Sequence, residues 1–445
     1  MKKLIALFSF LSFFSFVSLA QKQWTLEECI DYALERNISI KQLEIQKESA
    51  EIDVNTAQMR RLPNLNAGVN QNWNFGRAQN DSGVYVNNSV NTANMGISLS
   101  SDIPLFTGFR IPNEIKRNKL ELKAAVENLE KAKEDLALNI ASLYLQVLFN
   151  KELQKTNESQ LELSKDQIKK TQALVDVGKA PLSQLYDMEA QVANDEVSVI
   201  QATNNLKLAL LDLAQSLELE EISGFDIVSP VINDVIGEYM SSIQPPQVIY
   251  NNAVAIKPII KEQEYRIQSA EKSLKIAQAG YLPSLDLSLG YNTSYYHVYD
   301  SPRNIPFSDQ IKDKTSKYIG LSLNIPIFNR FSVRNQTRTA RLNISNQELV
   351  LNNVKKALFK DIQTAFLNAT SAQEKYQAAG RAVKASSESF NYAQERYEIG
   401  KSSVFEFNEA RTKYIRSLSE EIQAKYDYIF RTKILDFYNG IPIKL

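Results

Sequence analysis

The residues in this chain that could carry chemistry are mainly acidic. Glu406 and Glu409 lie three residues apart in a segment of helical periodicity, shortly after Gly400. Residues with this spacing share one face of a helix, so the two carboxylates are neighbours. A solvent-facing helix surface usually explains such a pair, and the pair alone therefore assigns no reaction.

The remaining residues give little support to catalysis. The chain has one histidine, His297, which falls in a predicted loop, and one cysteine, Cys29. A single histidine excludes a metal site built on histidines and argues against Ser–His or Cys–His catalysis. A single cysteine excludes an intramolecular disulfide. Since no glycine-rich phosphate cradle with a lysine occurs, we expect no enzyme activity, no cofactor and no metal, and any energy must come from a partner.

The composition is that of an ordered protein without a nucleic-acid partner. The 51 basic and 51 acidic residues give a formal net charge of zero, so no basic surface for nucleic acid is indicated. Only 14 glycines and 13 prolines occur in 445 residues, which argues against disorder and against a turn-rich sandwich.

The amino terminus has the features of a signal peptide over residues 1–20. Lys2 and Lys3 precede an apolar run over 4–17, and Ser18-Leu19-Ala20 places small residues before the expected cleavage point. The alternative, a transmembrane anchor, needs a longer apolar run. No later apolar run is long enough for a membrane helix, so an exported chain of this kind would cross a membrane only as a β-barrel.

The chain contains two copies of one unit. Leu62-Pro63 recurs as Leu282-Pro283, and Ile103-Pro104 recurs at almost the same offset as Ile325-Pro326. Gly178 and Gly400 are separated by the same offset as the two Ile-Pro pairs. Because this offset is far longer than the period of solenoid repeats, we interpret it as a duplicated domain-sized unit. The predicted repeats cover 21–219 and 245–443, with a linker at 218–247.

Each repeat is predicted to contain a helix, two strands, a long helix, a tip and a returning helix. Thr25 and Glu28 form a capping box at the start of the first helix. In repeat 1 these elements are expected at 25–60, 64–75, 93–100, 112–175, 176–181 and 182–217. In repeat 2 they are expected at 247–280, 284–295, 318–325, 332–397, 398–402 and 403–437.

The predicted strands have one apolar face and one small polar face. Met95, Ile97 and Leu99 alternate with glycine and serine, and Pro104 is expected to end strand pairing. The strand lengths are close to those of membrane strands, although a soluble meander would show the same pattern. Four strands do not close a barrel, so the membrane interpretation requires an oligomer, and three chains would supply twelve strands.

The long helices carry a seven-residue apolar repeat. Leu122, Leu129, Leu136 and Leu143 follow this spacing, which winds helices into a left-handed coiled coil. The helix predicted over 112–175 would be about 95 Å long at 1.5 Å per residue, too long for a compact domain. The helices predicted at 25–60 and 182–217, stacked end to end, would match its length and complete a cylinder wall.

This combination closely resembles the TolC-like outer-membrane efflux proteins, also called outer-membrane factors. The resemblance covers almost all of the mature chain. It rests on the duplicated element order, on the LP and IP corners, and on two turns, DVGKAPLSQL at Asp176–Leu185 and RYEIGKSSVFEFNEA at Arg396–Ala410. It implies a membrane α+β fold, in which four strands per chain build a homotrimeric twelve-stranded barrel in outer-membrane lipid. A long antiparallel coiled-coil tunnel would continue the barrel through the periplasm.

The resemblance also implies a function and its residues. Members are passive exit ducts of tripartite efflux or type I secretion systems, docked to a periplasmic adaptor (membrane fusion) protein and an inner-membrane transporter. Three copies of Glu406 and Glu409 would surround a gate and favour cations, and Tyr397 would help to close it. The tip residues expected to meet the adaptor are Val177, Gly178, Lys179, Ala180, Ile399, Gly400, Lys401 and Ser402.

The chain departs from the family pattern at the tip latch. Ser402 stands where the family's best-known latch has an arginine, and Gln184 replaces its acidic partner. We therefore expect closure to rely on hydrogen bonds and packing of Tyr397. A rival interpretation is an exported coiled-coil structural or adhesive surface protein with a β membrane anchor. It predicts rods outside the cell and no tunnel, and an anchor does not need the duplicated strands and tips.

Overall fold

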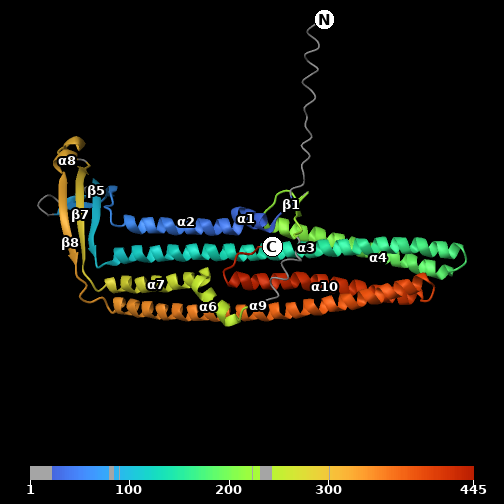
Figure 1. Ribbon diagram of the computed structural model, residues 1–445. Helices are drawn as coiled ribbons and strands as arrows, with labels where there is room; N and C mark the ends of the chain where they lie inside the picture. Colours follow the sequence, from blue (N-terminus) through green and yellow to red (C-terminus); the bar gives the residue numbers. More distant parts are fainter. Residues whose placement is uncertain are drawn as a thin grey trace, which may run out of the picture. The chain divides into compact units, whose positions relative to one another are not determined.

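A computed structural model describes residues 23–79, 85–89, 91–222, 224–230, 243–299 and 301–444, without the side chains of 77–79 and 85–89 (Figure 1). The predicted signal peptide and residues 231–242 of the predicted linker lie outside these ranges. The chain divides into two compact units. Unit 1 comprises Met1–Leu43, Leu129–Pro258 and Lys355–Leu445, and unit 2 comprises Glu44–Asn128 and Ile259–Val354.

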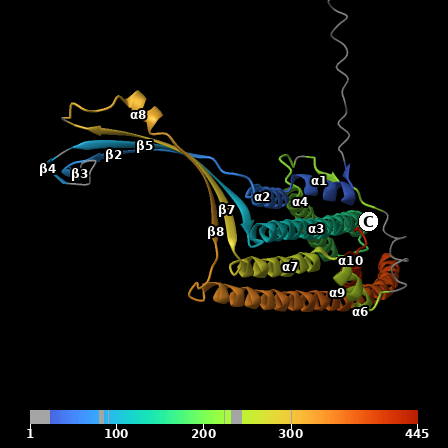
Figure 2. The same ribbon diagram turned by 90° about the vertical axis from the view of Figure 1, so that its left-hand side faces the viewer.

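Unit 2 is built around one antiparallel sheet. Its strands are β2 (Asn66–Asn74), β5 (Thr92–Thr107), β7 (Ser284–Val298) and β8 (Ser316–Asn324), in the order β2-β5-β7-β8 (Figure 2). Both repeats thus contribute two strands, and β5 of the first pairs with β7 of the second. The outer strands, β2 and β8, each have nine residues and each present one edge that no described strand covers. A short pair, β3 (Arg77–Gln79) and β4 (Tyr85–Ser89), lies between β2 and β5 in sequence.

The expectation that Pro104 ends strand pairing in repeat 1 is wrong. Strand β5 continues to Thr107, and Pro104 lies opposite Asp286 of β7. Pairing between β2 and β5 ends at Asn66 and Ser100, so β5 has a partner on only one side at this proline. A strand with one open side tolerates the missing N–H of proline. In repeat 2, by contrast, β8 ends at Asn324, before Pro326.

The assignment of His297 to a loop is also wrong, because β7 is longer than predicted. His297 lies opposite Ala93, one residue before the end of the strand at Val298. The short helix α8 (Phe307–Asp313) then contacts the same strand. Its buried Gln310 replaces a missing strand partner: the side chain accepts from Tyr296 N–H and donates to Tyr296 C=O, both at 2.9 Å.

The strand-to-helix junction has the same backbone in both repeats. Gly108 and Phe109 have φ of 60° and 64°, and the equivalent residues of repeat 2, Arg330 and Phe331, have φ of 52° and 60°. Each Phe packs edge-to-face on another Phe three residues earlier, with ring centroids 5.3 Å apart in repeat 1 and 5.6 Å in repeat 2. After this corner begin the helices α3 (Arg110–Asp176) and α9 (Ser332–Glu398), each of 67 residues.

The first helix of each repeat is divided, contrary to the predicted single helices at 25–60 and 247–280. In repeat 1, α1 (Leu26–Arg36) and α2 (Ile38–Met59) are separated by Asn37, whose Oδ1 accepts from Ser39 N–H at 2.9 Å and so caps α2. In repeat 2, α6 (Pro246–Ile256) and α7 (Pro258–Ala279) are separated by Lys257. The helical conformation is disfavoured for a residue that precedes proline, which explains the break at Lys257 before Pro258.

The break at Lys257 places a lysine inside unit 1. Its Nζ lies 3.1 Å from Glu134 and 3.5 Å from the centre of the Phe437 ring. Burial lowers the pKa of this lysine, and the ion pair with Glu134 partly opposes that effect.

The core of unit 1 connects the ends of the described chain to its long helices. Helices α3, α4 (Leu182–Ser216) and α10 (Val404–Tyr438) contribute most of its buried side chains. Strand β1 (Gln23–Trp24) pairs in parallel with β6 (Asp226–Ile227), a short strand inside the predicted linker. The buried Tyr144 hydroxyl donates to Val228 C=O at 2.7 Å and so joins α3 to this segment. In the described parts of the chain, no helix combines the length and apolarity needed to cross a membrane.

Candidate functional site at the helical tips

Both tips reverse the chain with the same turn. Gly178 and Gly400 have φ of 71° and 73°, a left-handed conformation that glycine adopts without strain. The following lysines donate backward across the turn, Lys179 N–H to Leu174 C=O and Lys401 N–H to Arg396 C=O, each at 2.8 Å. This is the Schellman arrangement that closes helix C-termini. The tips therefore follow from local sequence in α3–α4 and α9–α10, which reverse at the right of Figure 1.

The tips present apolar and basic side chains to solvent. Val177 and Ile399 precede the two glycines and are 66% and 65% exposed. Lys179 and Lys401 follow the glycines and are also exposed, whereas Ala180 and Ser402 are half-buried. An additional exposed aromatic residue, Phe405, stands at the start of α10. In each tip an exposed aliphatic side chain precedes the glycine and an exposed lysine follows it.

The predicted acidic pair lies in the first two turns of α10. Ser403 caps this helix by accepting from Glu406 N–H at 3.2 Å. The Glu406 carboxylate accepts from the Ser402 hydroxyl at 2.5 Å and lies 4.0 Å from Arg396. Both Glu406 and Glu409 are exposed. Ser402, which replaces the arginine of the family's latch, therefore interacts with the first residue of the predicted gate.

Tyr397 is buried and connects three helices. Its hydroxyl lies 3.3 Å from that of Thr171 on α3, and its ring stacks on Phe407 of α10 at a centroid distance of 5.1 Å. Near it, Lys170 of α3 pairs with Glu398 of α9 at 3.3 Å on the surface. Tyr397 thus holds the repeat-2 hairpin (α9–α10) against the repeat-1 hairpin (α3–α4) within one chain.

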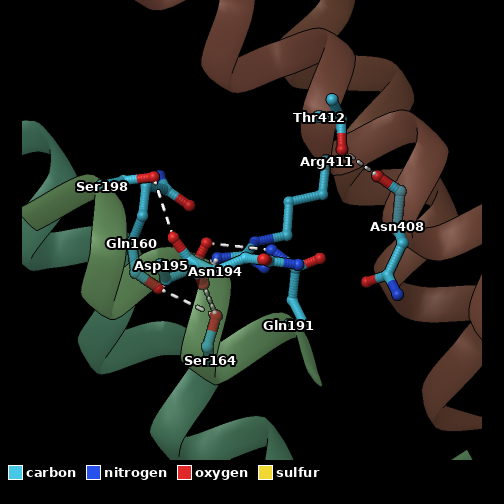
Figure 3. A network of polar contacts seen from close by, with 9 residues as sticks. All are labelled: Gln160, Ser164, Gln191, Asn194, Asp195, Ser198, Asn408, Arg411 and Thr412. Carbon is cyan, nitrogen blue, oxygen red and sulfur yellow. Dashed lines mark hydrogen bonds and ion pairs between the residues drawn. The ribbon is translucent and has the colours of Figure 1, made fainter. Parts of the chain in front are cut away.

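A second connection between the hairpins, which sequence reasoning missed, is a buried ion pair (Figure 3). Arg411 of α10 is 1% exposed, and its Nη2 lies 2.6 Å from Oδ2 of Asp195 on α4. The same nitrogen donates to Gln160 C=O of α3 at 3.1 Å. Asp195 also accepts from Ser164 and, at 2.9 Å, from Gln191. Removing one member of such a pair leaves a buried charge and costs about 3–5 kcal/mol.

The sequence does contain a signal for this pair. Val404, Phe407, Arg411, Tyr414 and Leu418 follow the alternating three- and four-residue spacing of a coiled-coil seam. On α4, Asp195 occupies such a position in the series Leu185, Met188, Val192, Asp195 and Val199. One charge interrupts each apolar seam, and the two charges are opposite. A charged residue in an apolar seam is buried and is therefore expected to pair with an opposite charge, but only the structure shows which residue is its partner.

Across the residues that the structure describes, histidine, cysteine, aspartate and glutamate form no group of three or more suited to a metal ion. The tips therefore offer exposed contacts, paired acids and buried connections between helices.

Comparisons with known proteins agree with this architecture. A model of the family described as outer membrane efflux protein matches residues 29–218 and 249–435, one segment in each repeat. The outer membrane protein TolC of Escherichia coli (strain K12) is 22% identical over 434 residues, which cover 96% of this chain and 84% of TolC.

Solved structures show the same fold. A crystal structure of CusC superposes with a TM-score of 0.78 at 17% identity, over 94% of this chain and 92% of that chain. The outer membrane channel CmeC of Campylobacter jejuni gives a TM-score of 0.74 at 20% identity, over 93% and 85% of the two chains. The chain therefore belongs to the outer membrane efflux protein family, whose members are outer-membrane exit ducts of efflux systems and not enzymes.

Proposed function

We propose that three copies of this chain form a passive exit duct that is gated at the helical tips, with Glu406 and Glu409 selecting for cations. The observation that supports this role most directly is the exposure of both carboxylates on one face of α10, next to the turn at Gly400. Three copies would bring six carboxylates to one level of the duct. A ring of carboxylates attracts cations and repels anions.

The sheet supports the trimeric assembly. Strands β2 and β8 have equal lengths of nine residues and opposite directions within the antiparallel order. Pairing β8 of one copy with β2 of the next satisfies both edges, which otherwise expose rows of unpaired backbone groups. Three copies joined in this way give a closed ring of twelve strands, in keeping with the membrane strands expected from the sequence.

The tips are the proposed contact with a periplasmic adaptor, which would connect the duct to an inner-membrane transporter of an efflux or type I secretion system. Val177 and Ile399 supply exposed apolar contacts, and Lys179 and Lys401 supply positive charge. The two tips have the same turn and the same order of residue types. Six similar tips in a trimer would suit an adaptor that itself binds in several copies.

Ion selectivity in planar lipid bilayers tests the gate. The double variant Glu406→Gln/Glu409→Gln should conduct but lose its preference for cations, because the amides keep the side-chain shape and remove the charge. Glu196→Gln is the matched control, since Glu196 is an exposed glutamate on α4 that pairs with Lys165 at 3.2 Å. Unchanged selectivity in the double variant would refute the gate assignment.

Site-directed crosslinking tests the docking role. A cysteine introduced by Lys179→Cys or Lys401→Cys should crosslink to a protein with the sequence of a periplasmic adaptor in intact cells. Lys207→Cys provides the control, because Lys207 is exposed on α4 but lies far along the helix from the tip. Equal capture of the adaptor from position 207 would show that the tips are not the docking site.

A further inference from the structure

The ion pair between Arg411 and Asp195 lies where coiled coils normally have apolar side chains. Arg411 and Asp195 are 1% and 8% exposed, and both follow apolar seam residues, Phe407 on α10 and Met188 on α4. Burial of two charges gives little net stability, because desolvation offsets their attraction. The best-attested role of a polar residue in a seam is to select one register between helices. The position of this ion pair is therefore typical of residues that align two neighbouring helices, here α10 and α4.

Near the tip, α10 packs through an apolar cluster that includes Val404 and Phe407, and buried polar groups of α3 lie beside it. On α3, Gln160, Ser164, Gln167 and Thr171 recur at three- and four-residue spacing, and the last three are at most 4% exposed. The Gln160 carbonyl accepts from Arg411 of α10, Ser164 donates to Asp195 of α4, and the Thr171 hydroxyl lies 3.3 Å from that of Tyr397 of α9. Apolar contacts are non-directional and would allow α10 to shift or turn against its neighbours. The ion pair allows a single alignment, since a displacement by one helical turn, about 5.4 Å, would leave two buried charges without partners.

The alignment of Arg411 determines the direction of the acidic pair on the same helix. At about 100° per residue, Glu406 and Glu409 lie about 140° and 160° around α10 from Arg411. The exposures agree, because Arg411 is buried and the Glu406 side chain is 56% exposed. A rotation of α10 that moved the acids toward α3 and α4 would have to separate Arg411 from Asp195.

We propose that Arg411 and Asp195 are positioning residues that set the rotation and register of α10, and thereby the direction in which Glu406 and Glu409 face. The role of the acids rests on the proposed function, whereas the alignment of α10 can be measured by itself. Ser402 and Gln184 cannot form the ion pair of the family's best-known latch, and the pair of Arg411 and Asp195 lies farther from the turn. It is a connection within one chain, between its two hairpins.

The hydrogen bonds of Arg411 predict which replacement is tolerated. Only Nη2 bonds to Asp195 and Gln160, while Nε and Nη1 are buried without a hydrogen-bond partner among the described residues. One nitrogen thus carries both contacts. A lysine offers one nitrogen and one positive charge, so Arg411→Lys should preserve the alignment, whereas Arg411→Met should not.

Distances between spin labels at Val197 of α4 and Glu409 of α10 measure the alignment. Both positions are exposed, and dilution of labelled chains with unlabelled chains isolates distances within one chain. Labels are attached to introduced cysteines in a Cys29→Ser background. The parent and Arg411→Lys should give one narrow distance. The paired apolar variant Arg411→Met/Asp195→Leu should stay folded, because such replacements are often neutral, but should give a broadened distribution or a second distance displaced by up to about 5 Å.

The control and the contrary outcome are specific. Arg416→Met removes an arginine from the same helix that is 81% exposed and pairs with Glu420 one helical turn away, so it should leave the distance unchanged. A single narrow distance in the paired apolar variant, identical to that of the parent, would overturn the proposal and leave the pair a purely structural role. Ion selectivity of the Arg411 and Asp195 variants, measured in chains that keep Val197 and Glu409, separates the two hypotheses. A displaced helix with unchanged selectivity would refute the gate and support the positioning role. An unchanged distance with altered selectivity would refute the positioning role alone.

Discussion

Glu218 and Gly440 occupy equivalent positions in the two repeats, and each ends a helix in the left-handed conformation, with φ of 57° and 82°. The same turn closes both helices: Leu219 N–H donates to Ala214 C=O at 3.1 Å, and Ile441 N–H donates to Asp436 C=O at 2.9 Å. Repeat 2 has glycine at this position, the residue that the left-handed conformation favours, whereas repeat 1 has Glu218.

This difference predicts opposite effects of substitution at the two positions. Glu218→Gly should stabilise the protein by about 1 kcal/mol, because a side chain in the left-handed region costs about 1–2 kcal/mol. Gly440→Ala should destabilise it by about 1–2 kcal/mol, because alanine is strained in the left-handed region. The added Cβ would also lie 2.4 Å from Cδ1 of Ile256, the flexible end of a side chain that can move aside. Thermal unfolding in detergent measures both. A lower melting temperature for Glu218→Gly would contradict the conformational argument.

The glycines at the tip and at the strand–helix junction should differ in their tolerance of alanine. A Cβ at Gly400 would meet no atom within 4 Å, so Gly400→Ala should cost only the backbone strain, about 1–2 kcal/mol. At Gly108 a Cβ would lie 2.8 Å from both Ala279 C=O and Leu282 Cβ, so Gly108→Ala should lower the melting temperature further. Gly400→Asn is the control for the turn, because asparagine tolerates this conformation. Equal losses at positions 400 and 108 would show that the close approach is unimportant.

The break between α1 and α2 should depend on the side chain of Asn37. Its Oδ1 accepts from Ser39 N–H and, at 3.3 Å, from Ile40 N–H. Asn37→Ala should therefore cost about 1 kcal/mol, and Asn37→Ser, which keeps an oxygen for the cap, should cost less. Melting temperatures of the two variants check this order. If Asn37→Ala and Asn37→Ser lowered the melting temperature equally, the side-chain cap would not be what stabilises the break.

Alkaline pH should destabilise unit 1 through its buried tyrosines. Burial raises the pKa of Tyr144, and the negative charges nearby act in the same direction. The folded state therefore keeps the proton above the ordinary value of 10.0, where the unfolded state loses it. The stability from this group is complete below pH 10 and falls as the pH rises from there toward the folded value.

Melting temperatures at pH 8 and pH 11 test this expectation. The decrease between the two should be smaller for Tyr144→Phe than for the parent, although the variant starts lower because it loses the hydrogen bond to Val228 C=O. Tyr186→Phe is a suitable control, since Tyr186 is 60% exposed. An equal decrease in Tyr144→Phe and the parent would exclude Tyr144 as a source of the pH dependence.

The local sequence predicted the parts of this protein that depend on neighbouring residues. Alternation and seven-residue spacing indicated strands and long helices, and Gly178 and Gly400 marked the turns, because conformational preferences act within a few residues. The recurrence of these landmarks at one offset showed that the elements occur twice. The tips of the candidate site were thus predictable, as was the common face of Glu406 and Glu409.

Tertiary structure decided the features that depend on residues distant in sequence. Strand β5 continues past Pro104 because β7, which belongs to the other repeat, pairs with it on one side while β2 has already ended. Tyr397 meets Thr171, and Arg411 meets Asp195, across separations of 226 and 216 residues. Spacing along one helix shows that a charge enters a seam, but its partner, and hence the alignment of α10, follows from the packing of separate helices.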